Sequence, residues 1–281
     1  MPCKDSIKIN LDKFSFEEKS GFKVSNLECS IEKNKNDIRL RDLSLSTNKS
    51  HLDIPMLSLS DNKGNGSMSF SMNPSDFACI LPELRSLDET WNISLEGNGD
   101  RQTINLSQLT ISQNNGALTL RANATVDNWK DSTSVLDANI NQLSFNTGLQ
   151  ETIQPILAFI NKDSQKASQQ GNTIEGLLTK FDDTDLNGHI TIAPSNIKAN
   201  ISATSGLGDI EALLSYKKNN LVAQAKTTNL QIGRLMTSNA DSIAHPDQIT
   251  AEVNLNAILN GKSGIPAGMR LQCRVRKMFH L

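Results

Sequence analysis

The 281-residue chain lacks long hydrophobic runs, has few aromatic residues and carries no excess of either charge. No window approaches the roughly 18 apolar residues that a membrane-spanning helix needs, and the opening MPCKDSIKINLDKF lacks the apolar centre of a signal peptide. Aromatic residues make up 4% of the chain, so we expect a lean, aliphatic core. Lys and Arg number 28 against 30 Asp and Glu, which gives no electrostatic case for nucleic acid or an anionic membrane surface.

Motifs for catalysis, cofactors and metals are also missing. The four cysteines form no C-x-x-C pair, and none has a histidine at metal-ligand spacing. The segment DDTDLNGHITIAP resembles the first half of a calcium-binding EF-hand loop, but Pro194 stands where the twelfth residue should be Glu. None of the four histidines belongs to a nucleophile motif. We therefore expect no catalytic residue, no cofactor and no metal site, in a protein that is not an enzyme.

Alternation of apolar and polar residues dominates what the sequence does contain. A clear example runs from Leu118 to Val126, and similar runs recur about every 10–14 residues between segments rich in Gly, Asn, Asp and Ser. Abundant Asn, Ser and Thr favour solvated strand faces over helical surfaces. The pattern predicts an antiparallel meander, with hairpin turns at GNGD after Glu96, QNNG before Ala117 and KKNN before Leu221.

A slip of one residue interrupts this alternation seven times, always in the form apolar-x-apolar-x-x-apolar-x-apolar. One copy consists of Ile104, Leu106, Leu109 and Ile111. An extra residue in a pattern of period two is what a β-bulge produces, and the residue before the third apolar position is often Asn, Asp or Gln. The seven copies, the last of them degraded, span residues 9–16, 22–29, 38–45, 52–59, 104–111, 138–145 and 225–232.

Three segments show helical periodicity instead. PSDFACILPELRSL predicts a short helix near residues 75–86, which Pro82 would shorten or kink. LQETIQPILAFINKD and NTIEGLLTKF predict two more helices, joined by a polar linker. We therefore divide the chain into a β-groove segment (1–148), a helical insertion (149–182), a continued β-groove segment (183–262) and an atypical basic tail (263–281). The composition of the tail differs from the Asn-, Ser- and Thr-rich composition of the rest, as expected for a truncated or frameshifted end.

A long meander must bury one face, and regularly placed bulges suit a sheet that curls. The sequence thus predicts a mainly β protein: a long antiparallel meander curled into an extended apolar-lined groove, with short helical insertions. A groove lined by aliphatic side chains suits acyl chains better than a sugar or a nucleotide. Its predicted lining residues are Ile104, Leu106, Leu109, Ile111, Leu118, Leu120, Ala122, Ala124, Val126, Ile140, Leu143 and Phe145.

The chain also resembles AsmA-like proteins, in particular the TamB-type translocation and assembly module proteins of Gram-negative envelopes, in a style similar to members from the Bacteroidota. The resemblance covers roughly residues 5–262. It is carried by SNLECSI, RDLSLST, NQLSFNT, TNLQIGRL, PSDFACILPELRSLDETWNISLEGNG, DLNGHITIAPSNIKANISA, and NLQIGRLM running into ITAEVNLNAILNGK.

The resemblance implies a periplasmic protein, anchored in the inner membrane, whose β-groove bridges toward the outer membrane. Implied roles are phospholipid transport along the groove and outer-membrane protein assembly with an Omp85-type partner. The anchor helix and the C-terminal domain of the family are not found in this chain, so we expect an internal piece, associated with the membrane through parts that lie elsewhere. The alternative is a closed β-sandwich or solenoid that acts as a binding or adhesin protein at the cell surface.

Overall fold

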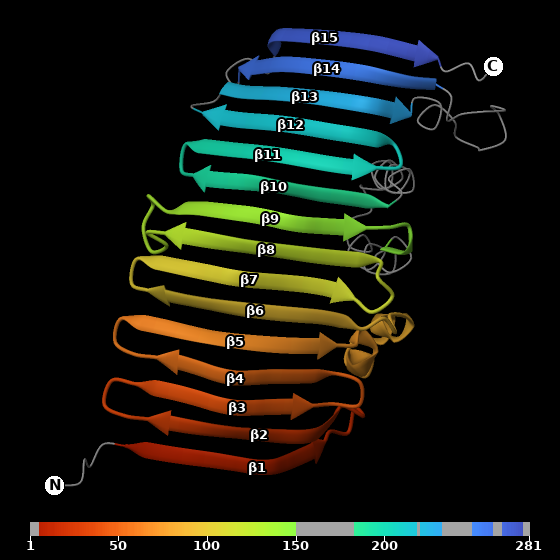
Figure 1. Ribbon diagram of the computed structural model, residues 1–281. Helices are drawn as coiled ribbons and strands as arrows, with labels where there is room; N and C mark the ends of the chain where they lie inside the picture. The colour runs from red at the N-terminus through yellow and green to blue at the C-terminus, as the bar shows by residue number, and fades with distance from the viewer. Residues whose placement is uncertain (1–5, 150–182, 218–219, 232–248, 261–265, 278–281) are drawn as a thin grey trace.

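One antiparallel sheet accounts for nearly all of the structure (Figure 1). The computed structural model describes residues 6–149, 183–217, 220–231, 249–260 and 266–277. Each strand pairs with its neighbour in sequence, so the sheet grows strand by strand from β1 to β15. The strands are β1 (Ile7–Glu17), β2 (Lys23–Lys33), β3 (Ile38–Ser46), β4 (His51–Leu59), β5 (Lys63–Met72), β6 (Trp91–Asp100), β7 (Thr103–Gln113), β8 (Leu118–Asp127), β9 (Val135–Phe145), β10 (Thr184–Ala193), β11 (Asn196–Ser205), β12 (Gly208–Lys217), β13 (Asn220–Gln231), β14 (Ile249–Asn260) and β15 (Pro266–Lys277).

The strand registers align the apolar residues into rows that cross the whole sheet. Residues directly opposite one another in an antiparallel pair lie on the same face. The sheet is therefore apolar on one face over its full length, as the alternation predicts. One such row, followed from β1 to β14, contains no polar residue: Ile9, Ile31, Leu40, Leu57, Gly66, Gly97, Leu106, Ala124, Ala138, Ile190, Ala199, Leu214, Ala223 and Ala257.

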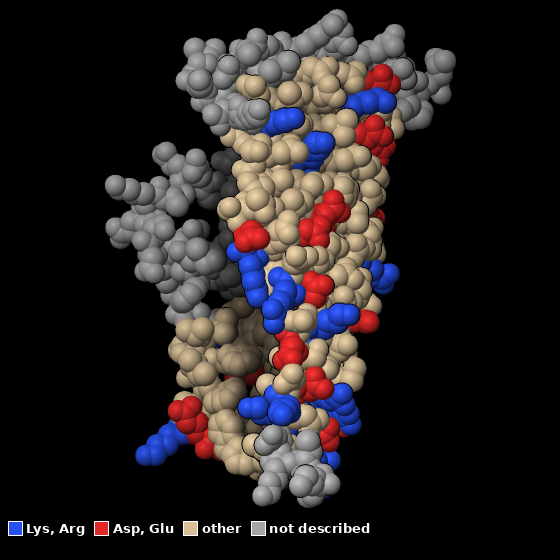
Figure 2. Space-filling view, turned by 90° about the vertical axis from the view of Figure 1, so that its left-hand side faces the viewer, with Lys and Arg blue, Asp and Glu red and all other residues tan. Residues whose placement is uncertain are grey.

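The opposite face is polar and solvated. Its side chains bond across strands, as in the contacts from Ser30 Oγ to Asn10 Oδ1 (2.9 Å) and from Asn139 Nδ2 to Asn123 Oδ1 (3.1 Å). On the side seen in Figure 2, where the strand ends at the left of Figure 1 face the viewer, acidic and basic side chains are interspersed. The sheet is thus amphipathic, with one apolar face and one polar face.

All seven predicted slips coincide with irregular pairing or with a left-handed residue. Register shifts occur at all seven of them, for example between Leu106 and Leu109 in the pairing of β7 with β8. At the slip in β3 the shift falls in its pairing with β2. Lys13, Asp42 and Asn229, each just before the third apolar position, adopt positive φ angles of 54°, 50° and 54°. The β-bulge prediction is therefore confirmed.

The predicted turn GNGD is wrong. Gly97 and Gly99 lie inside β6, and they pair with Gly66 and Gly64 of β5. The hairpin turn is instead formed by Arg101 and Gln102. The Asp100 carboxylate stabilises it by accepting hydrogen bonds from the backbone N–H groups of Gln102 and Thr103, each at 2.8 Å. Glycine marks a strand here because its neighbours across the ladder leave no room for a side chain.

The predicted helix near 75–86 takes the form of two 3₁₀ turns, η1 (Pro74–Phe77) and η2 (Pro82–Ser86). Proline supplies no N–H at position 82, so an α-helix running through both segments would lose a hydrogen bond there. The Phe22 ring stacks on the Phe77 ring with centroids 5.8 Å apart, which ties η1 to the start of β2. These turns cover the right-hand ends of the strands in Figure 1.

Fully buried residues gather at that same end of the strands. The apolar ones among the described residues are few: Val24, Ala78, Leu87, Ala117, Leu149, Leu207 and Ala251. Most of the apolar face is therefore only partly covered.

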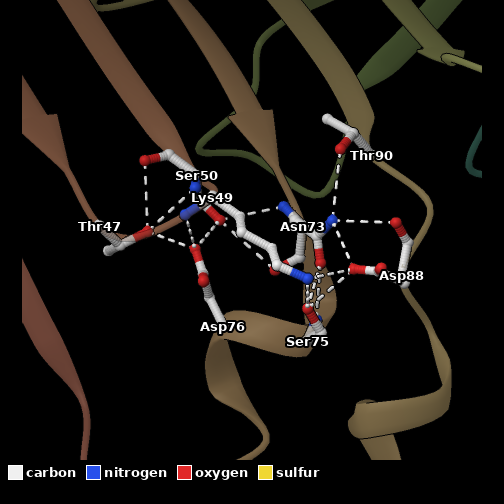
Figure 3. A network of polar contacts seen from close by, with 8 residues as sticks. All are labelled: Thr47, Lys49, Ser50, Asn73, Ser75, Asp76, Asp88 and Thr90. Carbon is white, nitrogen blue, oxygen red and sulfur yellow. Dashed lines mark hydrogen bonds and ion pairs between the residues drawn. The ribbon is translucent and has the colours of Figure 1, made fainter.

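A polar network fastens η1 to the sheet (Figure 3). The Asp76 carboxylate accepts hydrogen bonds from the hydroxyls of Thr47 and Ser50 and from the Lys49 N–H at 2.9 Å. Buried Asn73 caps η1 by accepting the Ser75 N–H at 3.0 Å. Burial by itself would raise the pKa of Asp76, but these hydrogen bonds outweigh it and hold the pKa below its ordinary value of 3.8.

Two of the predicted domain boundaries can be compared with the structure. The predicted helical insertion at 149–182 lies almost wholly outside the described residues. The expected tail at 263–281 supplies β15, which pairs with β14 from Ile249↔Lys277 to Leu259↔Pro266, so the sheet extends past the predicted boundary at 262. Within the described ranges, no helix is long and apolar enough to cross a membrane.

The lowered pKa of Asp76 predicts a specific loss of stability in acid. A group whose pKa is depressed by folding stabilises the fold above its unfolded pKa, and that contribution is lost as pH falls through the folded value. We expect urea midpoints of the wild type to fall below about pH 4. Asp76→Asn should be less stable than the wild type at pH 7 by about 1–2 kcal/mol. Its stability should fall less on acidification, because it lacks the carboxylate that becomes protonated. Parallel pH profiles for the two proteins would contradict the assignment.

The positive φ angle of Asp42 predicts which side chains this bulge tolerates. Glycine adopts such angles without strain, whereas a β-branched residue does not. Asp42→Gly should leave the urea midpoint nearly unchanged, and Asp42→Val should cost about 1–2 kcal/mol. Equal stability of the two variants would show that the bulge does not require the left-handed conformation.

Candidate functional site: the apolar groove

The twelve predicted lining residues lie on the same face of β7, β8 and β9. The register places Ile104 opposite Val126 and Leu109 opposite Ala122, and the latter lies opposite Ile140 on the next strand. Further pairs, such as Leu118 with Phe145, complete the set. None of the twelve is buried: eleven are half-buried, and Ile104 is 41% exposed. The structure thus brings the predicted residues together and leaves them accessible.

A cavity lies on the apolar face at the left-hand ends of β4 to β9 (Figure 1). Its volume is about 900 Å³, within the range of roughly 300–1,000 Å³ found for ligand pockets. Figure 2 views the molecule from this end and shows a hollow in its lower half, bordered by charged side chains. The predicted residues that line this cavity are Ile104, Leu106, Ala124 and Val126.

Other lining residues were missed at the sequence level, although a signal for some of them was present. Leu57 and Leu59 of β4 line the cavity, and they belong to the copy of the slip pattern at residues 52–59. Leu136 of β9 also lines it and opens the alternation that continues into the copy at 138–145. Applying the same pattern to every copy, rather than to three adjacent strands, would have found them.

Four glycines form the floor of this cavity. Gly64 pairs with Gly99 and Gly66 with Gly97, so two adjacent strands expose bare backbone where the neighbouring strands carry leucine and isoleucine. A Cβ atom built on Gly97 would lie 2.8 Å from a backbone oxygen of β7. The glycines therefore permit close packing of the backbone and remove side-chain volume from the groove.

Large exposed hydrophobic side chains surround this floor. Leu57 is 37% exposed, Leu59 47% and Trp129 42%. Soluble proteins seldom leave a contiguous apolar patch of this kind uncovered, because apolar surface in water costs about 25 cal/mol per Å². This exposed apolar patch is the surface on which a functional proposal can be built.

A serine–histidine–aspartate arrangement occurs on the polar face. Ser46 Oγ lies 2.8 Å from His51 Nδ1, and His51 Nε2 lies 2.7 Å from Asp53 Oδ2. These side chains stand on an open sheet, with the imidazole 47% exposed. The backbone N–H of Thr47, the residue after Ser46, already donates a hydrogen bond to the backbone oxygen of Ser50. It is therefore not free to stabilise an oxyanion next to Ser46. The geometry is that of a cross-strand polar contact.

The other polar motif of the sequence is also part of the ladder. Asp185 and Asn187 belong to β10, where alternate residues along a straight strand do not converge on one ion as an EF-hand loop does. On the same strand, His189 Nε2 lies 2.9 Å from Asp137 Oδ1, and the hydrogen bond that the Asp137 carboxylate accepts from this ring lowers the pKa of Asp137. Within the described part of the chain, no cluster of three metal-ligating side chains occurs.

Known proteins supply no further guide. No protein-family model, no curated protein and no solved structure matches this chain. The resemblance to AsmA-like proteins therefore stays a prediction, and the groove itself is the basis for a functional proposal.

The two faces of β8 predict opposite effects of introducing charge. Leu120 lies in an apolar row between Ile111 and Leu143, whereas Thr119 lies opposite Ser112 and Ser144. Leu120→Glu should lower the urea midpoint and the binding of an apolar dye, because a carboxylate would enter the groove. Thr119→Glu should change both only slightly. Equal effects of the two substitutions would refute the assignment of faces.

Proposed function

We propose that this protein is a non-enzymatic lipid-binding groove that holds phospholipid acyl chains along the apolar face of its sheet. The observation that carries the proposal is the row of apolar residues from Ile9 to Ala257, which crosses fourteen strands without a polar side chain. Fourteen strands at about 4.8 Å spacing extend for more than 60 Å. A continuous apolar path of this length suits a hydrocarbon that slides better than a ligand held at one point.

The chemistry of the lining supports acyl chains over other ligands. Sugars and nucleotides require convergent polar groups that fix their orientation. In this cavity the polar residues lie in the turns at its border or alternate along the strands with the apolar residues and glycines. Hydrophobic contact of this kind is non-directional, so it retains a lipid without fixing its position.

The biological setting that we propose follows the resemblance to AsmA-like and TamB-type proteins. In that setting the groove belongs to a periplasmic bridge, anchored in the inner membrane, that serves phospholipid transport or outer-membrane protein assembly with an Omp85-type partner. The closed β-sandwich alternative has less support, because the described strands form one sheet and not two packed sheets.

Native mass spectrometry of the purified protein, followed by lipid extraction, tests the proposal. We expect co-purified phospholipid, and we expect Ala124→Phe to reduce it, because Ala124 lines the cavity of about 900 Å³ and a ring would narrow the path. Thr125→Phe is the matched control, since Thr125 lies on the polar face opposite Asn105 and Asp137. A lipid-free protein that also fails to take up phospholipid from vesicles would refute the proposal.

A further inference from the structure

Basic side chains surround the mouth of the cavity that has the four-glycine floor. Lys63 follows the β4–β5 turn, Arg101 lies in the β6–β7 turn, and Lys130 lies in the connection from β8 to β9, and all three border the cavity. Three separate turns therefore bring one cation each to the same opening. We refer to Lys63, Arg101 and Lys130 as the basic rim.

The carboxylates near the basic rim are engaged by neutral donors. Asp100 Oδ1 accepts two backbone N–H groups at 2.8 Å, which hold its pKa below the ordinary value, with a smaller contribution from Lys63. Asp61 Oδ2 accepts a hydrogen bond from Asn36 Nδ2. Both carboxylates also line the cavity, and Lys63 acts on Asp100 through its charge without forming an ion pair with it.

The rim cations themselves form no ion pair with a carboxylate among the described residues. Arg101 Nη2 donates instead to the backbone oxygen of Asp61 at 3.4 Å, and Lys130 Nζ lies 4.6 Å from the centre of the Trp129 ring. The Trp129 indole N–H donates to Asp100 O at 3.2 Å, which holds the ring at the opening. An indole beside cations at the border of an apolar surface is the arrangement that matches the interface between lipid headgroup and hydrocarbon.

We infer that this opening is a headgroup site for a phospholipid, with the phosphate on the basic rim and an acyl chain over the glycine floor. The inference rests on the proposed function and adds a fixed position to it. Charge complementarity selects the occupant. The three cations outnumber the two carboxylates, Asp61 and Asp100, at this opening, and an apolar depression beside this excess of positive charge matches a lipid that carries a phosphate better than an uncharged lipid with the same chains. The lipid would enter or leave the groove at this end of the strands.

Two lipid probes with the same fluorescent acyl chain test the inference: phosphatidylglycerol, which carries a phosphate, and diacylglycerol, which does not. The wild type should bind phosphatidylglycerol more tightly, and the preference should shrink as salt rises, because the rim is exposed. Arg101→Gln with Lys130→Gln should weaken phosphatidylglycerol binding roughly tenfold and leave diacylglycerol binding unchanged. Arg121→Gln with Lys198→Gln is the matched control on exposed positions of β8 and β11.

A second variant tests the acyl part of the site. A Cβ atom at Gly64 would meet only the flexible Leu59 Cδ2 at 3.0 Å and one backbone oxygen at 3.6 Å, so Gly64→Val should fold. It should weaken the binding of both probes severalfold by filling the depression. Unchanged binding of both probes would overturn the placement of the acyl chain.

The remaining outcomes separate this inference from the proposed function. If the wild type binds neither probe, the proposed function fails and the headgroup site fails with it. If the wild type binds both probes equally and the rim variant behaves like its control, the groove stands and the headgroup site is refuted. Displacement of phosphatidylglycerol by millimolar inorganic phosphate would also refute it, since the rim would then be a site for free phosphate.

Discussion

Every feature of this molecule depends on keeping one apolar face in register across an antiparallel ladder. Side chains alternate with period two, so a shift of one residue moves all later side chains of a strand to the other face. At residues 104–111 the sequence contains such a shift, and Leu109 and Ile111 would face water if the pairing were regular. The bulge between Leu106 and Leu109 absorbs the extra residue, and the apolar row continues onto β8. The slips and the bulges therefore compensate each other.

The ladder also explains how a sheet of this size holds together with so small a core. Each strand pairs only with its neighbours in sequence, so stability comes from local terms that repeat along the sheet, as in solenoid proteins. The buried residues at the right-hand strand ends and the polar network around Asp76 stabilise one border of this ladder. The opposite border has its turns and the open cavity. Stabilising contacts and accessible apolar surface thus lie at different ends of the same strands.

The four glycines of β5 and β6 join the fold to the candidate site. In sequence, Gly97 and Gly99 suggest a hairpin turn, because glycine so often supplies positive φ angles. In the structure both are extended and pair with glycines across the ladder. They leave out side chains, which keeps the cavity at this end of the strands open. The β4–β5 turn, the β6–β7 turn and the β8–β9 connection bring the basic rim to the same place. No local pattern around any one of the three cations predicts that convergence.

The alternation and its seven slips by themselves determined the mainly β class, the meander, the bulges and the identity of the apolar face, because period-two patterning is local to each strand. The same patterning assigned Ile104, Leu120 and their neighbours to a common lining. Tertiary structure decided the rest. It resolved the segment near 75–86 into two 3₁₀ turns, added β15 to the sheet, and left the apolar face open by building one sheet instead of two packed ones. It also gathered the glycine floor and the basic rim from strands up to about seventy residues apart, through cross-strand pairing that no single segment of the sequence contains.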